Sequence, residues 1–197
     1  GSYDFECLDA VDVKLFNKHL EKLLAGEKVK CPTYNFLSGT SEYVTDPMDL
    51  KEDEILLIEG LHALNDELTK TIDNKYKYKI YISPLPILTL DNHNRIKMTD
   101  VRLLRRMVRD NETRGYNASS TLAHWPSVRE GEEKNVFPFE EEADVVFNTT
   151  LIYELSVLKT YAEPLLYAVE EDDENYKDVV RLLNLLKLVL PTSSENI

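Results

Sequence analysis

The stretch Thr99-Asp-Val-Arg-Leu-Leu-Arg-Arg-Met-Val-Arg-Asp-Asn-Glu-Thr-Arg-Gly115 predicts a helix that ends at its glycine. Helical periodicity sorts its residues onto two faces. One face carries guanidinium groups at spacings of i, i+3, i+4 and i+7, namely Arg102, Arg105, Arg106 and Arg109. The other face is apolar and includes Val101, Leu104 and Val108. This pattern is typical of an amphipathic helix whose apolar face packs against a core.

The arginine face needs negative charge close to it, because like charges on one helix face repel each other. The acids inside the stretch are too few to neutralise these arginines together with Arg114, which follows at the helix end; they are Asp100, Asp110 and Glu112. A bound polyphosphate would neutralise them, since the planar fork of donors on arginine matches phosphate oxygens. The alternative is a charged face that contacts only solvent.

The chain has 197 residues and a formal net charge of -13 at pH 7. This acidic balance argues against nucleic acid or an anionic membrane as a partner, because both require a broad basic surface. No apolar run approaches the roughly 20 residues of a membrane span, and no signal-peptide pattern is present. The two cysteines, Cys7 and Cys31, are too few for a disulfide framework. We therefore expect a soluble, cytoplasmic protein with one globular domain.

The N-terminal part of the chain predicts a helix followed by a hairpin. The helix is expected over about residues 10 to 25, with Asp9 as its cap and Gly26 at its end. The hairpin is expected over residues 28–44, where two strands flank a turn at Ser38-Gly39.

The run Glu54-Ile-Leu-Leu-Ile-Glu-Gly60 has no polar alternation, which is typical of a parallel strand covered by helices on both faces. Further helices are predicted at 65–72, 87–95, 117–128, 152–169 and 176–190, strands at 76–82 and 143–148, and a charged loop at 129–134. The tail from residue 192 onward is predicted to be disordered. This alternation of strands and helices predicts an α/β fold.

Three short segments carry candidate binding residues. Glu59, at the end of the predicted buried strand, could hold Mg²⁺ through water, although many buried strands end in an acid and a glycine. Tyr34-Asn-Phe36 places two rings on one side of a strand, where they could stack on a planar base or pack in the core. Phe5 and Glu6 pair a ring with an acid that could accept hydrogen bonds from sugar hydroxyls.

These segments resemble the uridine kinase and phosphoribulokinase family in order and spacing, over about residues 3 to 168. The resembling blocks are Tyr3-Asp-Phe-Glu-Cys-Leu-Asp-Ala-Val-Asp12, Pro32-Thr-Tyr-Asn-Phe36, Ile55-Leu-Leu-Ile-Glu-Gly60, the arginine stretch through Arg114-Gly115, and Glu142-Ala-Asp-Val-Val-Phe147. The run from Trp125 to Lys134 looks most like a bacterial uridine-kinase-like branch of this family.

The resemblance implies transfer of a phosphate from ATP or GTP, with Mg²⁺, to the 5′-hydroxyl of a nucleoside. The implied roles are catalysis by Arg106 and Arg109, binding of the nucleotide phosphates by Arg105 and Arg114, and binding of the nucleoside by Phe5, Glu6, Tyr34, Phe36 and His124. Arginines would dominate such a site, because phosphoryl transfer depends on positioning and charge neutralisation.

Two positions depart from the family pattern. The histidine that reads the pyrimidine edge in the family falls at Gly39, and a glutamine of the lid falls at His124. A lone histidine such as His124 is more often a surface or core residue than a catalytic one. The identity of the nucleoside is therefore left open.

The implied fold is a P-loop NTPase-like three-layer sandwich with a mainly parallel sheet, a β-hairpin and a helical lid at about 99–135. No Gly-x-x-x-x-Gly-Lys-Ser/Thr sequence occurs in the 197 residues. We therefore expect a truncated domain over residues 1–169, without the first strand, the phosphate loop, the first helix and the second strand. An acidic link, an amphipathic helix and a tail are expected over 170–197. Such a chain is expected to be inactive alone and to expose apolar surface that favours self-association.

Two interpretations of function follow. The first is an enzyme, either a nucleoside kinase or a kinase for a different small hydroxyl substrate. The second is a non-catalytic regulatory module that binds a nucleotide or a phosphorylated metabolite through the arginines and the aromatic hairpin. A phosphate-loop motif encoded within roughly 60 residues upstream of Gly1 would favour the enzyme. A start codon at Gly1 would favour the module.

Overall fold

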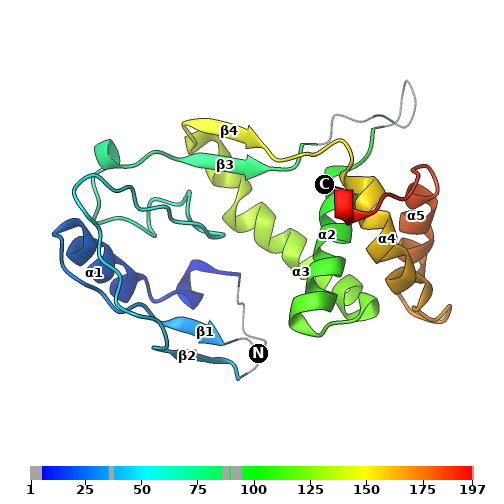
Figure 1. Cartoon of the computed structure of the whole chain (residues 1–197), viewed down its shortest axis with the longest axis horizontal. Helices are drawn as coiled ribbons and strands as arrows, with labels where there is room; N and C mark the ends of the chain where they lie inside the picture. Colours follow the sequence, from blue (N-terminus) through cyan, green and yellow to red (C-terminus); the bar gives the residue numbers. More distant parts are fainter. Residues whose placement is uncertain (1–5, 36–37, 86–88, 90–94, 197) are drawn as a thin grey trace. The chain divides into compact units, whose positions relative to one another are not determined.

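A computed structural model describes residues 6–35, 38–85, 89 and 95–196 of the chain. The chain folds into two compact units (Figure 1). Unit 1 comprises residues 1–81 and 128–145, and unit 2 comprises residues 82–127 and 146–197. The α-helices are α1 (Val13–Leu24), α2 (Met98–Arg114), α3 (Ala118–Asn135), α4 (Glu154–Tyr167) and α5 (Tyr176–Leu186). The strands are β1 (Thr33–Asn35), β2 (Thr40–Glu42), β3 (Ile80–Ser83) and β4 (Val145–Asn148).

The described residues form two sheets of two strands each. Strands β1 and β2 are antiparallel, with Thr33 opposite Glu42. Strands β3 and β4 point the same way in Figure 1, and hydrogen bonds from Asp144 N to Lys79 O and from Thr149 N to Ser83 O advance along both. Within the described part of the chain, the α/β character is confirmed, whereas the expected three-layer sandwich is not formed.

Helix α1 confirms the predicted N-terminal helix, with one correction at its start. Its cap is Asp12, not Asp9, because the Asp12 side chain accepts a hydrogen bond from Leu15 N at 2.9 Å. The chain then turns at Gly26, whose φ of 77° favours glycine. Leu20 is buried on one side of this helix, whereas Leu24 at its C-terminal end is exposed.

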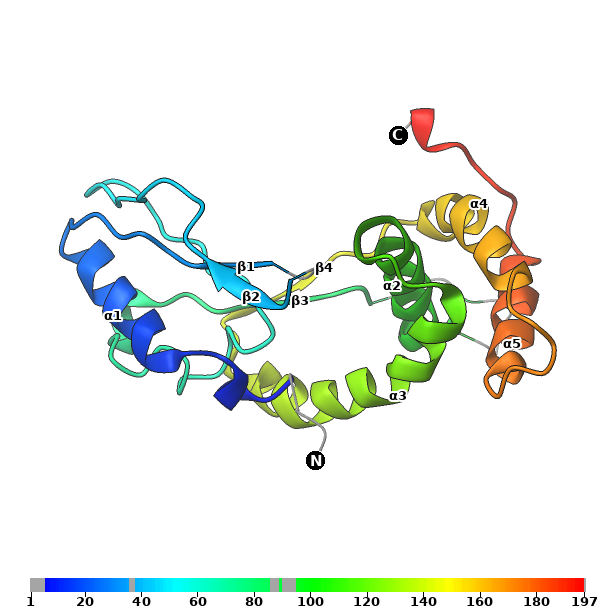
Figure 2. The same cartoon turned by 90° about the horizontal axis from the view of Figure 1, so that it is seen from below.

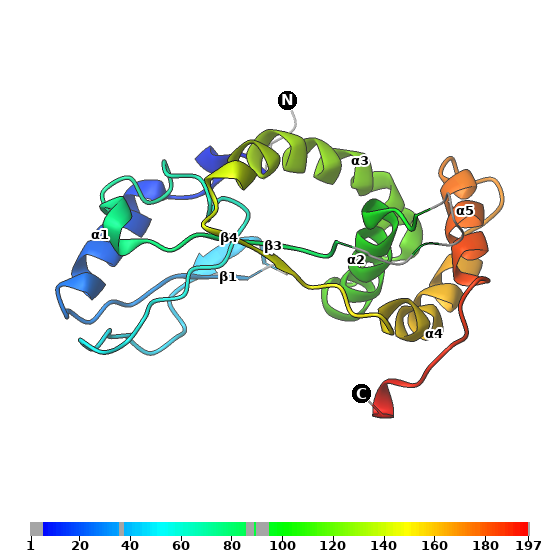
Figure 3. The same cartoon turned by 90° about the horizontal axis from the view of Figure 1, so that it is seen from above.

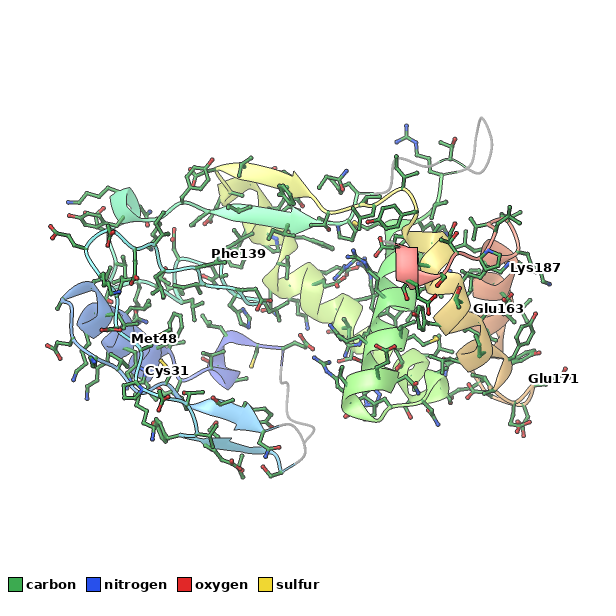
Figure 4. All side chains as sticks on the ribbon, viewed as in Figure 1. Cys31, Met48, Phe139, Glu163, Glu171 and Lys187 are labelled. Carbon is green, nitrogen blue, oxygen red and sulfur yellow. The ribbon has the colours of Figure 1, made fainter. Side chains whose placement is uncertain are left out.

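The predicted hairpin is confirmed as β1 and β2, with a turn through Gly39 at a φ of 69°. It is shorter than expected, since the strand does not run continuously from residue 28. Val29 instead makes an isolated bridge with Met48. Close to this bridge the side chains of Cys31 and Met48 meet, with Sγ 4.0 Å from Sδ (Figure 4).

The prediction of a buried strand at 54–60 is wrong. Residues 54–59 form no ladder, and Ile55 and Leu57 are 93% and 85% exposed. An apolar run becomes a strand only when another strand offers its backbone groups, and no described strand pairs with this one. The exposure of Ile55 and Leu57 agrees with the expectation that this chain has exposed apolar surface.

The prediction of a helix at 65–72 is also wrong, because the segment is a series of turns. Asn17 of α1 competes for its backbone groups. The Asn17 amide donates to Leu68 O at 2.8 Å, and its side-chain oxygen accepts from Thr71 N and from Thr71 Oγ1. These bonds fix the turns against α1 in unit 1.

Unit 2 has a core formed by helices, in which α4 contacts both α2 and α5. Figures 2 and 3 show α4 and α5 side by side from two directions. The predicted helices at 99–115, 152–169 and 176–190 are confirmed as α2, α4 and α5. The side chains with no exposed surface are Leu104, Met107, Ala162, Leu166, Leu182 and Leu186.

The predicted disordered tail contacts α4 in unit 2. Thr192 N donates to Ser156 O at 3.0 Å, and the hydroxyls of Tyr161 and Ser194 lie 2.6 Å apart. The tail is thus held by hydrogen bonds that its polar composition alone did not indicate.

The charged segment 129–134 is helical rather than a loop, because α3 continues through it to Asn135. Salt bridges at helical spacing stabilise it, with Arg129 2.7 Å from Glu132 and Lys134 paired to Glu130. The predicted helix at 87–95 lies mostly outside the described residues, although Thr89 and Arg95 are described and form an isolated bridge. No helix in the described ranges is long and apolar enough to cross a membrane.

Asp66 and Lys79 form the centre of a small ionic cluster in unit 1. Lys79 Nζ lies 3.0 Å from both Asp66 and Glu142, and Lys77 lies 3.2 Å from Asp66. Burial alone would raise the pKa of Asp66, but hydrogen bonds from Lys79 and Lys77 more than offset it and lower that pKa. Burial would lower the pKa of Lys79, but hydrogen bonds to Glu142 and Asp66 raise it instead.

Replacing Leu186 by alanine should lower the free energy of unfolding by about 2–5 kcal/mol, because it opens a cavity under α5. Leu188 lies two residues further on and is 63% exposed, so Leu188→Ala is the matched control and should change stability by less than about 0.5 kcal/mol. Urea unfolding followed by circular dichroism measures both variants. Equal, small losses would show that α5 does not pack on the core.

Replacing Asp66 by asparagine should lower stability at neutral pH by less than about 1 kcal/mol, because the pair is partly exposed. A carboxylate with a lowered folded-state pKa stabilises the fold above its unfolded pKa of about 3.9, and this contribution is lost as the pH falls through the folded value. The stability gap between wild type and variant should therefore close in acid. Urea unfolding across pH, with the exposed neighbour Glu67→Gln as control, measures this gap. A gap that stays constant or widens in acid would contradict the lowered pKa of Asp66.

Candidate functional site

The arginine side of α2 is gathered around one buried acid in unit 2. Asp110 is 1% exposed. Its carboxylate lies 3.0 Å from Arg109 Nη2, 3.1 Å from Arg106 Nε and 3.3 Å from Arg114 Nη1. Arg106 and Arg114 reach it because each is four residues away, which is one helical turn on either side.

One buried carboxylate thus contacts three of the arginines, although it does not neutralise them, as the sequence predicted. One carboxylate has enough acceptor positions to contact several guanidinium groups. Three positive charges against the one of Asp110 still leave a formal charge of +2 on the four side chains. The cluster of Arg106, Arg109, Arg114 and Asp110, the arginine cluster hereafter, therefore remains attractive to an anion.

Arg105 is held by a different acid. Its Nε donates to Glu154 at the start of α4, and the Glu154 side chain is largely buried. Sequence reasoning missed Glu154, because a separation of 49 residues carries no local signal. Asp100 at the other end of α2 is likewise paired, to Arg181 of α5. The predicted phosphate ligand Arg105 thus joins α2 to α4 within unit 2.

His124 lies on α3, in the part of that helix that belongs to unit 2. Its Nδ1 makes a 2.7 Å hydrogen bond with Ser120 O, and its ring stacks on Tyr116 with 5.9 Å between centroids. The imidazole is exposed, so it has access to a ligand. Its hydrogen bond and stacking also fit a surface histidine.

In unit 1, the structure brings together two of the predicted site acids. Glu6 and Glu59 line one pocket of about 320 Å³, together with Phe16, Gly60 and His62. Carboxylate oxygens accept hydrogen bonds from hydroxyl groups and are the ligands that Mg²⁺ prefers. Basic side chains are absent from the described residues that line this pocket, apart from the imidazole of His62. The pocket therefore suits an uncharged hydroxyl-bearing ligand or a cation better than an anion.

Two residues of this region were missed by sequence reasoning. His62 has no spacing to other histidines or cysteines that is typical of a metal site, yet it is buried at the pocket wall, and its Nδ1 has no hydrogen-bond partner within the described structure. Gly131 faces Glu6 so closely that a Cβ at this glycine would lie 2.9 Å from the Glu6 Cβ. The Asn135 side chain donates to Glu6 O at 2.9 Å. The C-terminal part of α3 therefore positions Glu6.

Of the three aromatic residues predicted to bind the nucleoside, one lies in the described part of the chain. Tyr34 lies on β1 and is half exposed, whereas Phe5 and Phe36 lie outside the described residues. Among the residues with described positions, no group of three or more acids, histidines or cysteines could hold a metal ion. Glu59 stays a predicted ligand that would act through water.

Comparison with known proteins places the chain in a family. Residues 1–155 match the phosphoribulokinase / uridine kinase family. The uridine kinases of Staphylococcus aureus strains JH9, Newman and JH1 are each 28% identical to it over 138 residues, which is 70% of this chain. The matched region spans 58% of the length of those relatives. The chain belongs to the phosphoribulokinase / uridine kinase family.

Proposed function

We propose that the chain is part of a uridine-kinase-like nucleoside kinase, which transfers the γ-phosphate of ATP or GTP to the 5′-hydroxyl of a nucleoside. The arginine cluster of α2 is the observation that carries this proposal. Family membership makes a phosphotransferase the expected activity, and the S. aureus relatives are described as uridine kinases. We expect the 197 residues alone to be inactive, since a phosphate-loop sequence does not occur in them.

The arginine cluster supplies what phosphoryl transfer needs from a protein. Charge accumulates on the phosphate oxygens during transfer, and fixed guanidinium groups stabilise it without reorganising. Arg106 and Arg109 would act on the transferring phosphate, while Arg114 would contact the other nucleotide phosphates. Arg105 keeps its Nε on Glu154, so it would contact a phosphate through its Nη groups, and we give it a smaller share of phosphate binding.

The unit 1 pocket supplies acceptor-binding groups. Glu6 would accept hydrogen bonds from the ribose hydroxyls, and Tyr34 would contact the base. The acidic lining favours a nucleoside over a phosphorylated sugar, because two carboxylates repel an anionic acceptor. His124 would contribute a further nucleoside contact.

The acidic pocket also fits Mg²⁺. Mg²⁺ keeps several of its waters and is bound through one or two carboxylates with substrate phosphates, so Glu59 alone is an adequate protein ligand. The metal would neutralise phosphate charge. Glu59 would orient one of its waters.

Phosphoryl transfer from ATP to uridine, assayed with the full translated product of the gene, tests the proposal. We expect uridine phosphorylation, and a drop in kcat of about a hundredfold or more for Arg109→Gln, which removes a charge at the reacting phosphate. Arg181→Gln on α5 is the control, since Arg181 pairs with Asp100 and Asp178 and should leave kcat close to wild type. Absence of phosphorylation with uridine, cytidine and other nucleosides would overturn the proposal. An unchanged kcat for Arg109→Gln would remove the arginine cluster from the mechanism.

Replacing Glu59 by glutamine should weaken Mn²⁺ binding to the chain about tenfold, because the carboxylate is the proposed ligand of the divalent ion. Electron paramagnetic resonance of free Mn²⁺ measures the affinity. Glu54→Gln, at the other end of the same run, is the control, because Glu54 contacts Lys51 instead of the pocket. Equal Mn²⁺ affinities for both variants would contradict the assignment of Glu59.

A further inference from the structure

The Asp110 carboxylate is the most buried charged group of α2. It accepts hydrogen bonds from Arg109 Nε at 3.2 Å and from Arg109 Nη2 at 3.0 Å. Arg106 Nε lies at ion-pair distance from the other oxygen, although the geometry leaves this Nε without a hydrogen bond. The Asp110 carbonyl also accepts from Tyr116 N, at the turn through Gly115 that ends α2. Asp110 thus fixes both the side chains and the helix end.

The arginine side chains around Asp110 are partly exposed. The side chain of Arg109 is 49% exposed, that of Arg114 is 31% exposed and that of Arg106 is 22% exposed. Arg109 has five N–H donors, and its hydrogen bonds to Asp110 use only its Nε and Nη2 atoms. Donors of this most exposed arginine therefore remain for a second anion.

Ordering an arginine side chain costs conformational entropy, and a ligand pays less of it when the side chain is already fixed. The ion pairs with Asp110, together with the two hydrogen bonds from Arg109, restrict these side chains before any ligand binds. The cost is electrostatic, because the carboxylate repels the phosphate that the arginines attract. Ordering of the arginines raises the affinity for phosphate, and repulsion by the carboxylate lowers it. The change in affinity when the carboxylate is removed therefore shows which effect is larger.

We propose that Asp110 is a positioning residue that holds Arg106, Arg109 and Arg114 as a preformed site for a phosphate group. The inference deepens the proposed function and rests on it for the identity of the phosphate as that of a nucleotide. The gain from preordering exceeds the repulsion between carboxylate and phosphate. Asp110 itself makes no contact with the ligand.

Inorganic pyrophosphate binding, measured by isothermal titration calorimetry at fixed ionic strength, tests the proposal on the whole chain. Asp110→Asn removes one negative charge and nearly preserves shape. We expect it to raise the dissociation constant about tenfold, which is the lower range for loss of a supporting partner at a preformed site. Glu112→Gln is the charge-matched control on the same helix, where the acid is exposed. It should bind pyrophosphate as tightly as wild type or slightly more tightly, because only repulsion is removed.

Tighter binding by Asp110→Asn, or binding equal to wild type, would overturn the proposal and make Asp110 a counter-ion only. Absence of pyrophosphate binding by the wild-type chain would also overturn it. Failure of nucleoside phosphorylation with an intact effect of Asp110→Asn on pyrophosphate would instead overturn only the proposed kinase function.

A second measurement decides the question if Asp110→Asn does not fold by circular dichroism. In ¹⁵N-arginine-labelled wild type, the Nε–H groups of the three arginines should have order parameters near the rigid value of about 0.85 without ligand. Addition of pyrophosphate should leave these order parameters nearly unchanged. Values below about 0.6 that rise on binding would show that the ligand, not Asp110, orders the arginines.

Discussion

The buried carboxylate of Asp110 governs the charged side of α2. A buried charge is tolerated when it is paired and hydrogen-bonded, and Asp110 forms ion pairs with three arginines and accepts two hydrogen bonds from Arg109. The same helix turns its apolar residues into the core that α2, α4 and α5 form in unit 2. One helix therefore both anchors a core and presents fixed guanidinium groups. The phosphate binding that we propose depends on both roles of α2.

The sequence predicted the elements whose signals are local. Helix α2 follows from its periodicity and from Gly115, and the β1–β2 hairpin follows from the turn residues around Gly39. Prediction failed where a distant partner decides the outcome. No strand among the described residues pairs with the run at 54–60, and the segment at 65–72 uses backbone groups to bond Asn17. The charged segment at 129–134 is different, because its acids and bases pair locally at helical spacing and so favour the helix over the predicted loop.

The candidate site was predictable to a similar extent. The arginines are visible from their spacing, but the burial of Asp110 is not, so its capacity to hold three of them was underestimated. The pairing of Glu154 with Arg105 was not predicted, because 49 residues separate them in the sequence. The close approach of Gly131 to Glu6 depends on packing within unit 1. For Asp110 the missing information was its burial, and for Glu154 and Gly131 it was a tertiary contact.

Chemical-shift mapping of inorganic triphosphate on the ¹⁵N-labelled chain tests most directly whether α2 binds phosphate. The arginine cluster predicts that the largest shifts fall on residues 105–116, with saturation at a single site. Shifts concentrated on the lysines of unit 1, such as Lys75, Lys77 and Lys79, would contradict a phosphate site on α2. Uniformly small shifts without saturation would contradict it as well.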